Sequence, residues 1–179
     1  WKYLENTKEA LEYTLKIKIA DIESTSAEVT NAAYYQEIVL KISKTAEKKK
    51  ESVLLTNVKD WIFTFMTGVE NSASNSVAGT GTNDVATNGV PFWLTVDFKE
   101  VKNVTGVQTT HWGAGYAPSK VEIFSSENGD DWVSIGQWDT KGRTQTITFD
   151  ERVKTRYLKY QMITVPSRVD ITRFYIYAW

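Results

Sequence analysis

The sequence of 179 residues contains no cysteine, which excludes disulfide bonds, thiolate metal sites and cysteine nucleophiles. It contains a single histidine, His111, and no apolar run approaches the roughly 18 residues of a membrane-spanning helix. The 21 basic and 22 acidic residues give a formal net charge of -1, so no global field favours nucleic acid or an anionic membrane. We therefore expect no nucleic-acid partner and no transmembrane segment.

The N-terminal part alternates apolar and polar residues with the period of a β-strand. Residues 11–20 (LEYTLKIKIA) and 34–43 (YYQEIVLKIS) each predict a strand with one wet face, and a helix over 4–16 is the alternative. Two strands cannot bury their apolar faces on each other alone. We therefore interpret residues 1–52, with a polar linker at 45–52, as a strand pair from a partial second β-sandwich. Its partner strands would come from upstream sequence or from the following domain.

Residues 53–179 predict a separate all-β domain. Short apolar stretches recur between turn signals at 61–66, 91–98, 104–111, 119–125, 131–137, 144–149, 155–163 and 169–179. Alternation places one set of side chains in the core: Phe92, Leu94, Val96, Phe98, Ile147, Phe149, Leu158, Tyr160, Met162, Phe174 and Ile176. Eight short strands at this spacing are typical of an eight-stranded jelly-roll β-sandwich.

The connections between these strands fall into two chemical classes. If successive strands run antiparallel, the connections 67–90, 112–118, 138–143 and 164–168 share one end of the sandwich, and 99–103, 126–130 and 150–154 share the other. The first set holds the Trp and Tyr residues and most of the Asn residues, and the second set is charged and without aromatic rings. One end is therefore predicted to offer aromatic faces beside amide and guanidinium groups, the combination that binds sugars.

Five residues of that end are candidate carbohydrate contacts: Asn88, His111, Trp112, Tyr116 and Arg168. Each also has a structural explanation. Trp112 beside two glycines is either a ligand platform or an anchor of its loop. A lone histidine at a strand end is more often a hydrogen-bonded structural residue, and an arginine in a short loop is more often simply solvated. Trp138 we interpret as a cap on the sandwich.

Four sequence blocks in order resemble the discoidin, or coagulation-factor type C, domain family, whose bacterial members include family 32 carbohydrate-binding modules. The blocks are 93–98 (WLTVDF), 104–107 (VTGV), 120–125 with 128–132 (KVEIFS and NGDDW), and 156–159 (RYLK). The resemblance covers about residues 53–179 and implies a galactose-binding-domain-like jelly roll that binds ligands through loops at one end. It also implies contacts at His111 or Trp112 and at Arg168 or its neighbours.

Departures from the family bear on calcium and on the ligand. The family's Asp-Gly…Thr-x-Trp segment is replaced by 82–89 (TNDVATNG), and the acidic residue of its last strand is absent near Thr172 or Arg173. Both features help to hold a structural calcium in the family, so we predict no cofactor, although a structural calcium remains open. The family's galactose-type polar set is not recognisable, and the sugar therefore stays open.

Residues 13–42 resemble the closing strands of a β-sandwich domain that precedes glycan-binding or glycosidase domains in Bacteroidetes surface lipoproteins. This resemblance implies an exported protein, on the cell surface as an outer-membrane lipoprotein or in the periplasm, with the rest of a larger protein upstream of Trp1.

The first functional hypothesis is thus a non-catalytic carbohydrate-binding module of an exported glycan-utilisation protein. The second is a protein-interaction or spacer module without a sugar site, which a buried Trp112 would favour. An enzyme is disfavoured, because there is one histidine, no cysteine, and no carboxylate pair that the predicted strands bring together in a cleft.

Overall fold

The computed structural model describes residues 11–18, 37–44, 50–78 and 84–179. Parts of both predicted N-terminal strands, most of the predicted linker and the 79–83 part of the long loop lie outside these residues. The chain divides into two compact units, residues 1–50 and 51–179. Each unit is described by itself.

The described part of the first unit is an antiparallel hairpin of β1 (Leu11–Lys18) and β2 (Glu37–Lys44), with Leu15 opposite Leu40. The alternative of a helix over 4–16 is wrong where the structure describes it, because residues 11–16 are in β1. Val39 and Leu40 are each 46% exposed. Since adjacent strand residues point to opposite faces, both faces of this hairpin are open at that point.

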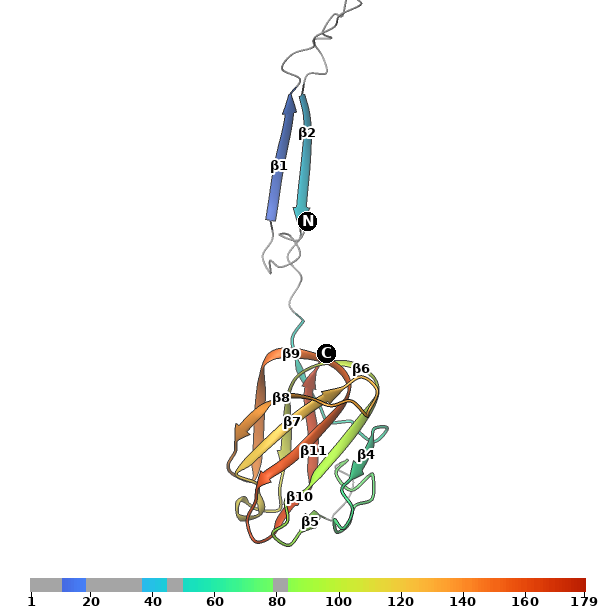
Figure 1. The fold of residues 1–179 in the computed structure, drawn as a ribbon, viewed down its shortest axis with the longest axis vertical. Helices are drawn as coiled ribbons and strands as arrows, with labels where there is room; N and C mark the ends of the chain where they lie inside the picture. The colour runs from blue at the N-terminus through green and yellow to red at the C-terminus, as the bar shows by residue number, and fades with distance from the viewer. Residues whose placement is uncertain (1–10, 19–36, 45–49, 79–83) are drawn as a thin grey trace, which may run out of the picture. The chain divides into compact units, whose positions relative to one another are not determined.

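The described residues of the second unit form strands and one short 3-10 helix (Figure 1). Its elements are β3 (Val53–Leu55), β4 (Ile62–Phe65), β5 (Val85–Thr87), β6 (Trp93–Thr110), η1 (Ala114–Tyr116), β7 (Lys120–Ser126), β8 (Val133–Asp139), β9 (Thr144–Thr164), β10 (Val169–Ile171) and β11 (Arg173–Ala178). In the described residues, a seven-stranded sheet has the order β3-β11-β6-β9-β7-β8, with β4 also paired to β6, and β5 pairs with β10 in a separate ladder. No helix among them is a candidate for crossing a bilayer.

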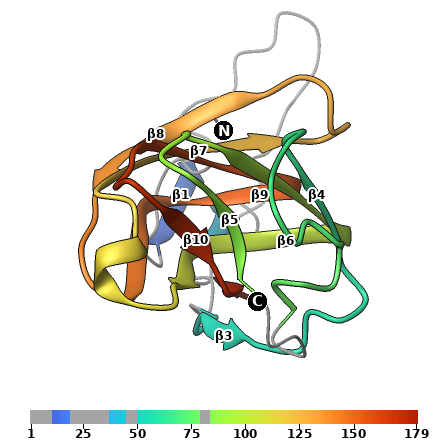
Figure 2. The same ribbon diagram turned by 90° about the horizontal axis from the view of Figure 1, so that it is seen from below.

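Strands β6 and β9 each bend, and the parts of the two strands on either side of the bend define two halves of this unit, which the strands hold together. They pair antiparallel over two stretches, with Trp93 opposite Gln161 at one end and Thr110 opposite Thr144 at the other. The ladder is interrupted between Asp97 and Lys102, where Lys99 has a positive φ of 68°. Such an irregularity bends the strand, and the sheet curls over the core to form the jelly roll (Figures 1 and 2).

The core lies between the curled parts of the sheet and contains the predicted apolar positions. Every inward residue predicted above is buried, from Leu94, Val96, Leu158, Tyr160, Met162, Phe174 and Ile176 at 0% exposure to Phe149 at 5%. Phe174 contacts Phe63 and Tyr160 in edge-to-face geometry, with ring centroids 6.1 and 5.9 Å apart. The predicted all-β jelly roll is confirmed.

The boundaries of several strands differ from those predicted. The charged stretches 99–103 and 150–154, predicted as connections, lie within the continuous strands β6 and β9, because pairing resumes across the bend. The predicted strand 169–179 is divided at Thr172 into β10 and β11, which join different ladders. Strands β3 and β5, three residues each, were not predicted.

Candidate functional site

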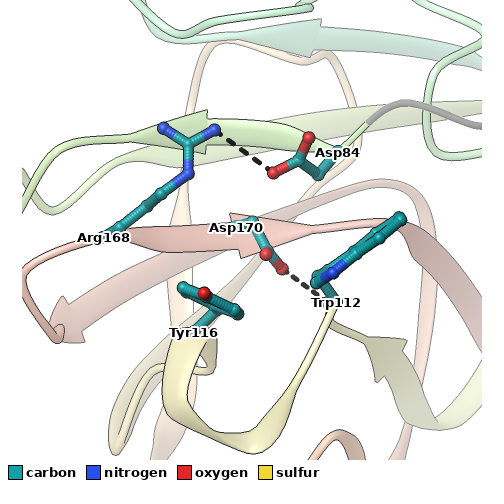
Figure 3. Close-up of a pocket in the computed structure, with 5 residues that line it drawn as sticks. All are labelled: Asp84, Trp112, Tyr116, Arg168 and Asp170. Carbon is teal, nitrogen blue, oxygen red and sulfur yellow. Dashed lines mark hydrogen bonds and ion pairs between the residues drawn. The ribbon is translucent and has the colours of Figure 1, made fainter.

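A pocket of about 260 Å³ lies at one end of the jelly roll. It is lined by Asp84, Trp112, Tyr116, Arg168 and Asp170 (Figure 3). These residues come from three segments far apart in the sequence: the residue before β5, the connection between β6 and β7, and the start of β10 with the loop before it. The antiparallel β5–β10 ladder, in which Asp170 lies opposite Ala86, brings two of the segments together.

The aromatic side of the pocket comes from the connection between β6 and β7. Trp112 is 62% exposed and Tyr116 is 41% exposed, so both rings offer surface to a ligand. The Tyr116 ring lies over Gly113, since a Cβ atom at Gly113 would be in ordinary van der Waals contact with it, 3.5 Å from Cδ2. In Figure 3 the two side chains lie on either side of the Asp170 carboxylate. The pocket therefore has two aromatic walls with an acceptor between them.

Arg168 forms the opposite wall and is held by three neighbours. Its Nη2 lies 3.0 Å from Oε2 of Glu70 and 3.3 Å from Oδ2 of Asp84, and its Nη1 donates to Oδ1 of Asn88 at 3.2 Å. The hydrogen bond to Glu70 is the main reason that the pKa of Arg168 is raised. The guanidinium thus ties the β9–β10 connection to the segment around β5.

Asp170 forms the floor of the pocket and is 1% exposed. Its Oδ1 accepts a hydrogen bond of 2.9 Å from the backbone N–H of Trp112. Burial raises the pKa of Asp170 to about 6, the nearby Asp84 carboxylate adds to this, and the Trp112 N–H and Arg168 oppose it. Asp170 is therefore anionic at neutral pH but becomes protonated under mildly acidic conditions.

His111 lies beneath the pocket with its side chain fully buried. Its Nδ1 bonds to the backbone carbonyl of Asp170, so Nδ1 carries the proton and Nε2 accepts from the hydroxyl of Thr109 at 3.2 Å. Burial lowers the pKa of His111, which is consistent with a neutral ring. In this position the side chain supports β10 and cannot touch a ligand, which corresponds to the structural explanation weighed above.

Some of the other residues predicted from the sequence line the pocket, and others do not. Trp112, Tyr116 and Arg168 line the same pocket. Asn88 is exposed beside it, donating to Oε1 of Glu70 as well as accepting from Arg168. Trp138 lies in β8 and packs on Phe149, with ring centroids 5.6 Å apart, and does not line the pocket.

The sequence interpretation missed both carboxylates of the pocket. It held that no carboxylate pair meets in a cleft, and this is wrong, because Asp84 and Asp170 line the same pocket. Their meeting depends on the pairing of two three-residue strands about 80 positions apart. One local signal was available: Asp170 stands between Val169 and Ile171, and a charged residue inside a short apolar strand is rarely buried without a special reason.

No metal site is assembled by the described ranges. They contain no group of three or more His, Asp or Glu side chains that could hold a metal ion. Of the two positions near which the family carries its acidic residue, Thr172 and Arg173, neither is acidic, and Thr172 donates its hydroxyl to the backbone carbonyl of Thr110 at 2.9 Å. The residues present do not fit the family's structural calcium.

The fold and the pocket at its end define a discoidin-like jelly roll with a site lined by loops. The chain belongs to the F5/8 type C domain family, whose model matches residues 64–174. A search of curated proteins finds no match.

Solved structures of low sequence identity share the fold. A family 32 module of Clostridium perfringens in complex with GalNAc-β-1,3-galactose is 17% identical, with a TM-score of 0.58, covering 70% of this chain and 100% of that one. The family 32 module of Clostridium perfringens NanJ in complex with galactose is 21% identical, with a TM-score of 0.54, covering 70% and 98%. A two-domain protein of unknown function from Bacteroides fragilis is 15% identical, with a TM-score of 0.56, covering 93% of this chain and 59% of that one.

Proposed function

We propose that residues 53–179 are a non-catalytic carbohydrate-binding module that binds sugar in the pocket between Trp112, Tyr116 and Arg168. The observation that carries the proposal is the convergence of two exposed rings and several polar groups on one pocket. The apolar C–H face of a pyranose packs on an indole or phenol ring, and its hydroxyls bond to neighbouring carboxylate, amide and guanidinium groups.

The dimensions of the pocket favour a small part of a glycan. A volume of about 260 Å³ is slightly below the range of about 300 to 1,000 Å³ that is usual for pockets holding a drug-sized ligand. It is suited to one sugar ring, such as the end of a chain. The family to which the chain belongs, and the sugars named for the two modules of Clostridium perfringens, support the same ligand class.

The competing function, a protein-interaction or spacer module of a cell-surface assembly without a sugar site, would be favoured by a buried Trp112. Trp112 is instead 62% exposed, more than any other aromatic side chain in residues 50–78 and 84–179. An indole held on the surface costs free energy through its contact with water. A ligand that covers the ring offsets this cost.

Binding to an array of neutral oligosaccharides and polysaccharides tests the proposal. We expect Trp112→Ala to weaken binding by about tenfold or more, because the stacking surface is removed. Tyr116→Phe keeps the ring and removes the hydroxyl, and so distinguishes the contributions of the two groups to binding. The matched control is Val101→Ala, which truncates a residue that is 56% exposed in the bend of β6, outside this pocket, and should bind as the unmodified chain does. Binding unchanged in Trp112→Ala would refute the assignment of this site.

The two carboxylates of the pocket call for a test of the non-catalytic assignment. Glycosidases use a pair of carboxyl groups, one as acid and one as base or nucleophile. Asp84 is held in an ion pair with Arg168, and Asp170 is held by the Trp112 N–H, so each already has a structural partner. Prolonged incubation with the oligosaccharides that bind should therefore release no reducing ends. Hydrolysis lost in Asp170→Asn would overturn the assignment.

We further propose that residues 1–52 belong to a second β-sandwich domain of an exported bacterial glycan-utilisation protein, on the cell surface as a lipoprotein or in the periplasm. The open faces of the β1–β2 hairpin and the two-domain protein of Bacteroides fragilis support this. Fractionation of cells producing the whole protein, with proteinase treatment of intact cells, tests the location. Recovery in the cytosol would refute it.

A further inference from the structure

The charges that line the pocket are unbalanced. Two carboxylates, Asp84 and Asp170, face it together with one guanidinium, that of Arg168. A third carboxylate, Glu70, lies 3.0 Å from the same guanidinium. Since the formal charge of the whole chain is only -1, this excess of acid is a local property of the pocket.

Among the described residues, Arg168 is the one cation of the lining, and it is already engaged. Nη2 of Arg168 faces both Glu70 and Asp84, and Nη1 faces Asn88. A ligand carboxylate that sought this guanidinium would have to displace these partners and would then lie near their negative charges. An acidic sugar therefore gains little from Arg168 and is repelled by its neighbours.

Asp170 is the buried acceptor that faces the pocket. Within the described residues, its hydrogen bond to the protein is made through Oδ1, to the Trp112 N–H, and no fully buried side-chain oxygen or nitrogen lacks a partner. Oδ2 has no such bond among them, and Asp170 lines the pocket. His111 supplies no countercharge, because its ring is neutral and its Nδ1 bonds to the backbone carbonyl. The site therefore offers a poorly solvated anion to whatever enters.

The walls on either side of this anion are aromatic. Trp112 and Tyr116 lie on either side of the Asp170 carboxylate in Figure 3. The face of an indole or phenol ring attracts a cation, most strongly where water is displaced. Rings and carboxylate therefore favour the same kind of ligand group, a positively charged one.

We propose that the pocket prefers a sugar that carries a protonated primary amine over the neutral parent sugar, and that it disfavours the corresponding uronic acid. This inference rests on the proposed function, since it names the class of sugar bound at the same site. Oδ2 of Asp170 is the acceptor for the ammonium group, and Trp112 and Tyr116 are its aromatic walls.

Two matched sugar series test the preference: galactosamine, galactose and galacturonic acid, and glucosamine, glucose and glucuronic acid. Affinities are measured at pH 7 by calorimetry or by ligand-observed NMR with the whole chain. We expect the amino sugar of at least one series to bind about tenfold more tightly than its neutral parent, and the uronic acid of that series more weakly than either. A neutral sugar that binds as tightly as its amine, or a uronic acid that binds best, overturns the preference and leaves the proposed function intact.

Charge-removing variants locate the preference. In Asp170→Asn the ratio of amine to neutral affinity should fall close to one, while the neutral sugar still binds. Asp150→Asn, the same substitution on an exposed part of β9 outside this pocket, should leave the ratio unchanged. If Asp170→Asn keeps the full ratio, Asp170 is not the acceptor and the inference fails.

A change of pH provides a readout that needs no variant. At pH 5 the ratio should fall in the unmodified chain, because Asp170 becomes protonated, while the charges of Arg168 and of the amine persist and His111 stays beneath the floor. A ratio that is equal at pH 5 and pH 7 contradicts the role of Asp170. No binding by any of the six sugars, together with no binding on the neutral array, overturns the proposed function itself and the inference with it.

Discussion

The backbone N–H of Trp112 donates a hydrogen bond of 2.9 Å to the carboxylate of Asp170, a residue 58 positions later in the chain. The bond joins the start of the aromatic loop to β10, the strand on which the floor of the pocket lies. His111, one residue earlier, bonds to the backbone carbonyl of the same aspartate. The position of Asp170 is therefore fixed by the two residues, His111 and Trp112, that begin the connection between β6 and β7.

Asp170→Asn should stabilise the chain at neutral pH. The pKa of Asp170 is raised to about 6 from an ordinary value of 3.8, so the folded state binds a proton more tightly than the unfolded state does. The stability of the unmodified chain therefore falls as the pH rises from about 4 to about 6 and is then level with respect to this group. We expect the variant to gain up to about 3 kcal/mol in free energy of unfolding at pH 7.

Urea unfolding of both chains at pH 4, 5, 6 and 7 measures this difference. The lowered pKa of His111 acts in the opposite direction in both chains, and because its Nδ1 lies 3.8 Å from Oδ1 of Asp170, the difference between the chains also contains the coupling of these two groups. A difference that does not grow between pH 4 and pH 6 would contradict the burial of a charged Asp170.

Asp97 and Arg156 should show the reverse dependence on pH. Nε of Arg156 lies 2.8 Å from Oδ1 of Asp97 and Nη2 lies 2.9 Å from Oδ2, and this bidentate pair lowers the pKa of Asp97 to about 2. The stability it contributes is present above the ordinary pKa of 3.8 and is lost as the pH falls toward 2. Because Arg156 is partly exposed, we expect Asp97→Asn to cost only about 1 kcal/mol at pH 7.

Thermal unfolding at pH 7, 4 and 2.5 measures the contribution of this pair, which should shrink at the lowest pH. Glu100→Gln is the control, since Glu100 pairs with Lys102 on the exposed bend and its loss should leave the melting temperature unchanged. Equal effects of the two substitutions would mean that the bidentate geometry has no special value.

Gly106 in β6 should not tolerate a side chain. A Cβ atom there would lie 2.3 Å from the backbone oxygen of Ile147 on the paired strand β9, and a backbone atom cannot move aside cheaply. Gly106→Ala should cost at least about 2 kcal/mol. Gly115→Ala in η1, where nothing lies within 4 Å, should be close to neutral. Chemical denaturation of both variants compares them, and equal stabilities would contradict the close approach of β6 to β9.

Gly89→Ala should weaken sugar binding as well as stability. Gly89 has a φ of +70°, and a Cβ atom there would lie 3.3 Å from the backbone oxygen of Ser167, beside Arg168. Gly68→Ala is the matched control, because Gly68 has a φ of +87° but nothing within 4 Å. Both should lose about 1 kcal/mol from the strained backbone, but only Gly89→Ala should lower affinity on the neutral array. Equal affinities of the two variants would contradict the coupling of these loops.

Much of the fold could be predicted because apolar core residues alternate with polar residues along the strands. Phe92, Leu94, Val96 and Phe98 alternate with polar residues, and the structure buries all four. The bend of β6 could not be predicted in this way. Its charged residues resemble a loop, and only the partner strand, which places Thr155 opposite Lys102, shows that the ladder resumes.

The candidate site could be predicted in part for a similar reason. Alternating connections placed Trp112, Tyr116 and Arg168 at one end, and they line one pocket, although two of the connections counted, 99–103 and 150–154, lie within β6 and β9. Asp84 and Asp170 were missed, because their meeting depends on a ladder between β5 and β10 that has only three residue pairs. Short non-local pairings of this kind leave almost no trace in local alternation.

The continuity of β6 and β9 through both halves of the jelly roll has a consequence for how the domain opens. Each strand supplies backbone hydrogen bonds on both sides of its bend, with Val96 opposite Leu158 before it and Val107 opposite Ile147 after it. Neither half can unfold while the other stays folded, because unfolding of either half would separate the same two strands, β6 and β9. Deep amides on both sides of the bend should therefore exchange with solvent in a single cooperative event, whereas the loops that line the pocket can open by themselves.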